Sequence, residues 1–121
     1  MNALVWVGVA LLGGCAAIGR SAIDRSIDSR SEARFPFGTL AVNTSGALLL
    51  GLLTGLAVRG DALILLGSAT LGSYTTFSTW MLQTRRLAMD GEMALAAANI
   101  LLSLAIGVGA AALGRAIGLG L

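Results

Sequence analysis

The sequence predicts an all-α membrane protein with four transmembrane helices in a single domain that covers residues 1–121. It is 56% hydrophobic and only 12% charged, whereas soluble domains contain about 25% charged residues. A helix needs roughly 20 apolar residues to cross a bilayer, and it satisfies its own backbone polar groups in lipid. Four stretches of about that length have no charged side chain: residues 1–19, 35–58, 62–84 and 93–114. The predicted helices cover residues 2–23, 35–58, 62–88 and 92–118.

The first predicted helix has a surface of small residues at which another helix can approach closely. This surface consists of Gly13, Gly14, Ala16 and Ala17. Arg20, near the end of the helix, either extends to the lipid headgroups as an anchor or has a further role. Residues 12–15 are similar to a lipoprotein cleavage site, but the segment lacks the basic start of a secretory signal. Cys15 is therefore expected to pack as a small apolar residue.

A polar connector of alternating charges follows at residues 24–34, and a short interfacial helix could form within it. The second predicted helix begins beside Pro36, whose missing N–H costs nothing in a first turn. Asn43 lies about two turns further on, and an amide inside a membrane helix must find a partner or water. Gly51 and Gly55 form a GxxxG pair that is suited to close helix packing, although such pairs are common.

The third predicted helix concentrates polar groups near its midpoint, at Ser73. Six of the seven residues from 73 to 79 carry a hydroxyl. Gly67, Gly72 and β-branched residues weaken the helix locally, so a break is expected near the bilayer midplane. Irregular backbone at that depth must be buried in protein or line a cavity, and such breaks bind ions in channels and transporters. An inert, hydrogen-bonded contact between helices explains the hydroxyls equally well.

The fourth predicted helix carries a polar-to-small stripe. Asn99, Ser103 and Gly107 recur every four residues and therefore share one face. Such a stripe either packs on another helix or lines a narrow pore. Gly114 and Gly118 form a second GxxxG pair near the end of the helix.

The polar groups of the four predicted membrane segments exclude several classes of function. The uncharged stretches 1–19, 35–58, 62–84 and 93–114 contain no Asp, Glu, His or Lys, so no proton-relay carboxylate, metal cluster or catalytic constellation is recognisable, and an enzyme is not expected. The net charge of +2 is too small and too scattered to indicate nucleic acid binding. Hydroxyls and amides can donate to an anion, and aromatic ring edges are electropositive. These groups favour a small anion as the ligand, which would follow a narrow path. Four helices are too few to surround such a path generously, so an oligomer is expected.

Two motifs stand out, Phe35-Pro36-Phe37-Gly38-Thr39-Leu40-Ala41-Val42-Asn43 followed by Gly46, and Thr75-Thr76-Phe77-Ser78-Thr79. Together they resemble the CrcB/Fluc family of fluoride channels. The glycine-rich first helix with Arg20, and the stripe that begins at Asn99, fit as well. The resemblance implies an antiparallel, dual-topology dimer in a bacterial inner membrane. Its two narrow pathways would let fluoride leave the cell passively and relieve fluoride toxicity.

The resemblance also implies roles for individual residues. Asn43 would line each pathway, and Phe77 would take the place of one pore phenylalanine. Ser78, Thr79 and Ser103 would supply a track of hydroxyls. The backbone carbonyls of Gly72 and Thr75 would hold a structural sodium ion at the dimer centre, shared by both subunits. Arg20 matches the arginine of the family's first helix.

Two positions of the pathway depart from the family pattern. The second pore phenylalanine is usually three residues after the first, and this chain has Trp80 there. The indole adds bulk and an N–H donor, which affects pore shape and conduction rate. The fourth helix often carries a tyrosine where this chain has Asn99.

The arginines are divided unequally between the two ends of the predicted bundle. Arg59 and Arg115 share the side of both termini. The opposite side has five others, with Arg20 nearby: Arg25, Arg30, Arg34, Arg85 and Arg86. An excess of Lys and Arg in a connector favours the cytoplasmic side of the membrane. We therefore expect the connectors between helices 1 and 2 and between helices 3 and 4 to lie in the cytoplasm. The chain then has one preferred orientation and pairs with a sister subunit inserted the other way, whereas equal insertion in both directions predicts a homodimer.

Two other classes of membrane protein remain as alternatives. Small four-helix multidrug exporters resemble this chain in length and antiparallel dimerisation, but they rely on a glutamate in the first helix, which is absent here. A non-conducting assembly subunit would explain the GxxxG pairs but not the hydroxyls at mid-membrane.

Overall fold

The computed structural model describes residues 1–30 and 34–121, and the elements within these ranges are all helical. Residues 31–33, part of the predicted polar connector, lie outside the described residues. The elements are α1 (Ala3–Arg30), α2 (Phe37–Gly55), α3 (Gly60–Leu63), the π-helix η1 (Ile64–Leu71), α4 (Gly72–Tyr74), α5 (Ser78–Met89) and α6 (Met93–Gly120). Of these, α1, α2 and α6 are long and apolar enough to cross a membrane. The remaining hydrophobic segment is divided among shorter helices.

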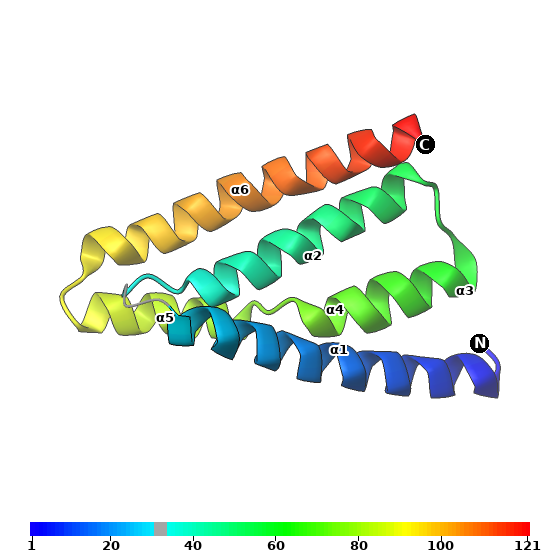
Figure 1. The fold of residues 1–121 in the computed structure, drawn as a ribbon, viewed down its shortest axis with the longest axis horizontal. Helices are drawn as coiled ribbons and strands as arrows, with labels where there is room; N and C mark the ends of the chain where they lie inside the picture. Colours follow the sequence, from blue (N-terminus) through cyan, green and yellow to red (C-terminus); the bar gives the residue numbers. More distant parts are fainter. Residues whose placement is uncertain (31–33) are drawn as a thin grey trace.

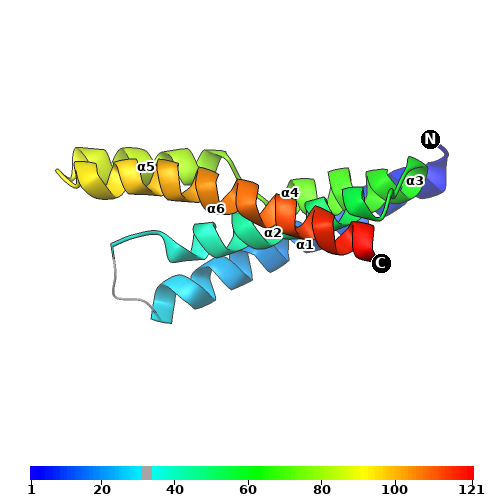
Figure 2. The same ribbon diagram turned by 90° about the horizontal axis from the view of Figure 1, so that it is seen from above.

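The helices form an elongated bundle with both chain termini at one end (Figure 1). Helices α2 and α6 run side by side in the same direction and make the most extensive contact of the fold. Helix α1 lies along η1 and α4, and α5 packs on α6. At the end opposite the termini, the α1–α2 corner and the α5–α6 hairpin diverge (Figure 2).

The contact between α2 and α6 is made backbone to backbone. A Cβ atom at Gly51 would overlap the Ala111 carbonyl, and one at Gly114 would overlap the Leu48 carbonyl. Gly55 and Gly118 face each other in the next turn, where a Cβ at Gly118 would lie 2.9 Å from the Gly55 Cα. The two GxxxG pairs of the sequence therefore pack against one another. Small residues in membrane helices allow this close approach, which gains dispersion energy where the hydrophobic effect contributes little.

Helix α1 continues beyond the predicted end at residue 23 and reaches Arg30. The first charged residues mark the point at which a helix leaves the hydrocarbon, and they do not end the helix itself. In the continuation, Arg25 Nε donates to the Ser21 carbonyl. Helix α2 ends earlier than predicted, at Gly55, because Ala57 and Gly60 adopt positive φ angles of 57° and 64° and turn the chain into α3.

The extension of α1 caps the start of α2. Asp28 Oδ1 accepts the backbone N–H of Gly38 at 3.0 Å, in the first turn of α2, where Pro36 supplies no side-chain cap. The first N–H groups of a helix have no partner within it, and the positive end of its dipole favours a carboxylate. Asp28 therefore joins the two helices by an N-capping interaction across the connector.

Replacing Asp28 by alanine should lower the free energy of unfolding by about 1 kcal/mol, the usual value of a lost N-cap. The measurement is thermal unfolding of the detergent-solubilised protein. Asp28→Asn keeps the acceptor oxygen and should unfold close to the unaltered chain. An alanine variant as stable as the aspartate form would show that the Gly38 N–H finds water equally well.

Candidate functional site

The third hydrophobic segment is interrupted beside α2. Helix α4 ends at Tyr74, Thr75 is extended with φ −81° and ψ 160°, and α5 begins at Ser78. The preceding turns are wide, because η1 is a π-helix, at the end of which the Gly72 N–H donates to the Gly67 carbonyl five residues back. Such wide turns are rare and occur frequently at functional sites. The segment therefore changes backbone geometry twice within a short distance.

Asn43 of α2 holds the interrupted backbone. Its Nδ2 donates to the Thr76 carbonyl and its Oδ1 accepts the Thr76 N–H, both at 2.8 Å. Gly46, one turn further along α2, lets the helix approach, since a Cβ there would overlap the Thr75 Cγ2. The amide of Asn43 thus satisfies both polar groups of Thr76, and its second N–H has no acceptor among the described residues.

The interruption redirects two backbone donors. In an α-helix the Thr76 N–H would bond to the Gly72 carbonyl, and the Thr79 N–H to the Thr75 carbonyl. Here the Thr76 N–H bonds to Asn43, and the Thr79 N–H bonds to Thr76 Oγ1 at 3.3 Å. The carbonyls of Gly72 and Thr75 are thereby released from their usual helical donors.

Two aromatic rings follow the interruption. Phe77 and Trp80 meet edge to face, with ring centroids 5.8 Å apart and an interplanar angle of 83°. Phe77 is 69% exposed in the single chain. The T-shaped geometry is the one that aromatic quadrupoles prefer, so each ring limits the orientation of the other.

Asn99 lies behind these rings, in the contact between α5 and α6. Its side chain is only 1% exposed, and its Nδ2 donates to Thr84 Oγ1 at 2.8 Å. The indole N–H of Trp80 donates to the Asn99 carbonyl at 3.0 Å. In this chain Asn99 therefore contacts α5 and lies away from the exposed face of Phe77.

The three residues of the predicted hydroxyl track lie on two different helices, α5 and α6. Ser78 and Thr79 begin α5, directly after Phe77. Ser103 Oγ is buried without a hydrogen-bond partner among the described residues, as is Arg20 Nε. Tyr74 OH lies 2.9 Å from Ser45 Oγ and forms a second polar contact between the interrupted segment and α2.

A groove of about 700 Å³ runs over the interruption. Predicted site residues that line it are Asn43, Gly72, Thr75, Phe77 and Trp80. Ser78, Thr79, Ser103, Asn99 and Arg20 are not among its lining residues. The sequence analysis missed Thr76 and Thr84, although Thr76 belongs to the hydroxyl cluster that indicated the site. Nothing local in the sequence marks Thr84.

Comparison with known proteins assigns the chain to a family. Residues 7–115 match the model of the family described as "CrcB-like protein, Camphor Resistance (CrcB)". The chain is 49% identical over 115 residues to a Mycobacterium tuberculosis (strain ATCC 25618 / H37Rv) protein named Fluoride-specific ion channel FluC 2, covering 95% of this chain and 91% of the relative. It is 44% identical over 121 residues to Fluoride-specific ion channel FluC 1 of Symbiobacterium thermophilum, covering 95% and 98%.

A relative in Streptomyces avermitilis, also named Fluoride-specific ion channel FluC 1, is 44% identical over 115 residues, which cover 92% of this chain and 90% of the relative. The family match and the three apolar helices together indicate a multi-pass membrane protein. The extent of the family match and the identity to these relatives show that this chain belongs to the CrcB family.

Proposed function

We propose that this chain forms a passive, fluoride-selective channel that exports fluoride down its electrochemical gradient. The observation that carries the proposal is the interrupted segment beside Asn43, which lies in a groove with an exposed aromatic ring. A dehydrated anion needs donors. This site offers electropositive ring edges and the second N–H of the Asn43 amide, which has no acceptor in the part of the chain that the structure describes. The names of the relatives, which specify fluoride, support the same ion.

The proposed pathway passes Asn43 and the edge of Phe77, with Trp80 beside it. Ser78, Thr79 and Ser103 supply hydroxyls along the route, and Ser103 Oγ is already buried without a partner among the described residues. Asn99 contributes to the pathway indirectly, because its backbone carbonyl accepts the indole N–H of Trp80. Arg20 of α1, whose Nε is similarly buried without a partner among the described residues, contributes positive charge.

The proposed functional unit is an antiparallel dimer of four-helix subunits, with the interrupted segment near the bilayer midplane. One chain leaves Phe77 69% exposed and the groove open on one side. A second subunit packed against this groove would enclose a narrow path, whereas the described helices of one chain leave the groove open. We place the dimer in the bacterial inner membrane, surrounded by lipid.

A structural sodium ion at the dimer centre is part of the proposal. Unwound backbone carbonyls coordinate Na⁺ in membrane proteins, and the released carbonyls of Gly72 and Thr75 fit this role. Within residues 1–30 and 34–121, no cluster of His, Cys, Asp or Glu could hold a metal, so backbone oxygens would be the ligands. The ion would hold the two interrupted segments together by charge.

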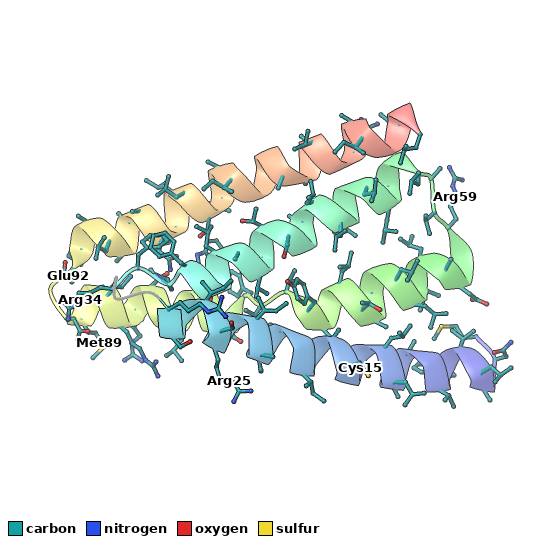
Figure 3. All side chains as sticks on the ribbon, in the orientation of Figure 1. Cys15, Arg25, Arg34, Arg59, Met89 and Glu92 are labelled. Atoms are coloured by element: carbon teal, nitrogen blue, oxygen red, sulfur yellow. The ribbon has the colours of Figure 1, made fainter. Side chains whose placement is uncertain are left out.

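The charge distribution favours a sister subunit as the partner. Arg34 lies at the end of the bundle opposite Arg59, and Arg25 lies between them along α1 (Figure 3). Such a bias gives a membrane protein one orientation, and relatives carrying the numerals 1 and 2 are consistent with paired subunits. Reporter domains fused to the C-terminus should then be found on one face only. Equal populations on both faces would support a homodimer.

The test of function is fluoride efflux from liposomes that contain the purified chain, with chloride as the comparison ion. Fast fluoride efflux without chloride efflux is expected, either from this chain alone or after co-reconstitution with the sister subunit. A folded protein that releases neither ion under both conditions would contradict a channel and favour a non-conducting assembly subunit.

A further inference from the structure

The two departures from the family pattern meet in one hydrogen-bonded unit. Trp80 Nε1 donates to the Asn99 carbonyl at 3.0 Å. Asn99 Nδ2 donates to Thr84 Oγ1 at 2.8 Å, and Thr84 Oγ1 donates to the Trp80 carbonyl at 2.9 Å. The three bonds form a closed ring between α5 and α6. We call these residues the Trp80–Thr84–Asn99 unit.

Burial makes this unit stiff. Asn99 is 1% exposed, and a buried amide requires hydrogen-bond partners, because leaving it without them is unfavourable. Asn99 can meet that requirement only while Thr84 and the backbone of α5 stay in place. The side chain of Asn99 therefore fixes the α5 turn that carries Trp80, and the indole N–H fixes the ring.

We propose that the unit is a positioning device for Phe77, an inference that rests on the proposed function. Phe77 meets the Trp80 indole edge to face. Because α6 holds the indole through Asn99, the indole determines how the edge of Phe77 faces the groove. The indole N–H already bonds to the Asn99 carbonyl, so Trp80 offers an anion only C–H edges, as phenylalanine would. Trp80 and Asn99 thus act together as positioning residues.

The test uses Thr84, which lies outside the groove lining and can be changed without altering an aromatic ring. Thr84→Val keeps the shape and removes the hydroxyl that joins Asn99 to the Trp80 carbonyl. Thr84→Ser restores the hydroxyl. Ser29→Ala is the control for loss of a hydroxyl, because Ser29 Oγ donates to the Ser26 carbonyl at 3.0 Å on an exposed part of α1 and lies outside both the groove and the unit.

Two readouts are measured for each variant. Fluoride efflux is recorded in liposomes, and the fluorescence of Trp80 is recorded in a Trp6→Phe background, which leaves Trp80 as the one tryptophan of the chain. Because Thr84→Val removes the hydrogen bonds that join Asn99 to α5, it should slow efflux about fivefold to tenfold and lower the fluorescence anisotropy of Trp80. Thr84→Ser should recover both values, and Ser29→Ala should change neither.

The outcomes separate this inference from the proposed function. If the unaltered chain conducts and Thr84→Val leaves both efflux and Trp80 anisotropy unchanged, the positioning unit is refuted while the channel stands. If the unaltered chain releases no fluoride with or without a sister subunit, the channel is refuted, and the anisotropy of Trp80 still decides whether Thr84 holds the ring. A Thr84→Ser variant that fails to restore a lost efflux would also overturn the inference.

Discussion

Replacing Asn43 by aspartate should reduce fluoride efflux at least about a hundredfold. The change keeps the size of the side chain and the oxygen that accepts the Thr76 N–H, but it removes the donor to the Thr76 carbonyl. It also places a negative charge beside the proposed anion path. Two like charges about 4 Å apart repel by about 4 kcal/mol at an effective dielectric constant near 20, and each 1.4 kcal/mol corresponds to about tenfold.

The matched control is the same substitution at Asn2. Asn2 Oδ1 accepts the Val5 N–H at 3.0 Å at the start of α1, and aspartate serves equally well as an N-cap. Asn2→Asp should therefore conduct fluoride at the rate of the unaltered chain. The assay is fluoride efflux from liposomes at equal protein content. Efflux from Asn43→Asp within threefold of the unaltered chain would remove Asn43 from the proposed pathway.

The distribution of charge in the sequence predicted three long apolar helices because lipid excludes charged side chains. Three of the four uncharged stretches, 1–19, 35–58 and 93–114, largely coincide with α1, α2 and α6, the described helices that are able to cross a membrane. The fourth stretch, 62–84, is divided among shorter helices. Helix ends could not be predicted by the same rule. Helix α1 continues through charged residues to Arg30, because a helix can extend into the headgroup region, where these side chains are solvated.

The candidate site was indicated by composition, but its contacts were not. The hydroxyl cluster pointed to residues 73–79, and the interruption lies among them. The partner of Asn43 is 33 residues away, at Thr76, and no local pattern predicts such a pair. Asn99 shares a helical face with Ser103, yet whether that face meets a pore or another helix depends on how α5 packs, which only the three-dimensional structure decides.

The GxxxG pairs also show that a sequence motif does not identify its contact partner. Each was visible in the sequence, but such pairs are too common to reveal a partner. The structure places Gly51 and Gly55 against Gly114 and Gly118. The shared spacing of four residues lets two parallel helices repeat one close contact in successive turns, so the bundle depends on four positions without a Cβ.

Replacing Gly114 by alanine should therefore destabilise the folded chain by about 2 kcal/mol or more, within the range found for overpacked cores. The new Cβ would overlap the Leu48 carbonyl oxygen and lie 2.9 Å from the Leu52 backbone nitrogen. Backbone atoms cannot rotate away as a side chain can, so α2 and α6 must separate along their whole contact. The measurement is the midpoint of unfolding in denaturant, together with the fraction of monodisperse protein after solubilisation.

Gly109→Ala is the control for the intrinsic effect of alanine in α6. Among the described residues, no neighbouring helix comes within 4 Å of a Cβ at Gly109, and alanine is favoured over glycine in a helix by about 1 kcal/mol. This variant should be as stable as the unaltered chain or more so. Because both substitutions add the same methyl group to the same helix, their difference isolates the contact with α2. Equal stability of the two variants would show that α2 and α6 can move apart at little cost, and that the glycine pairs do not determine how closely the helices pack.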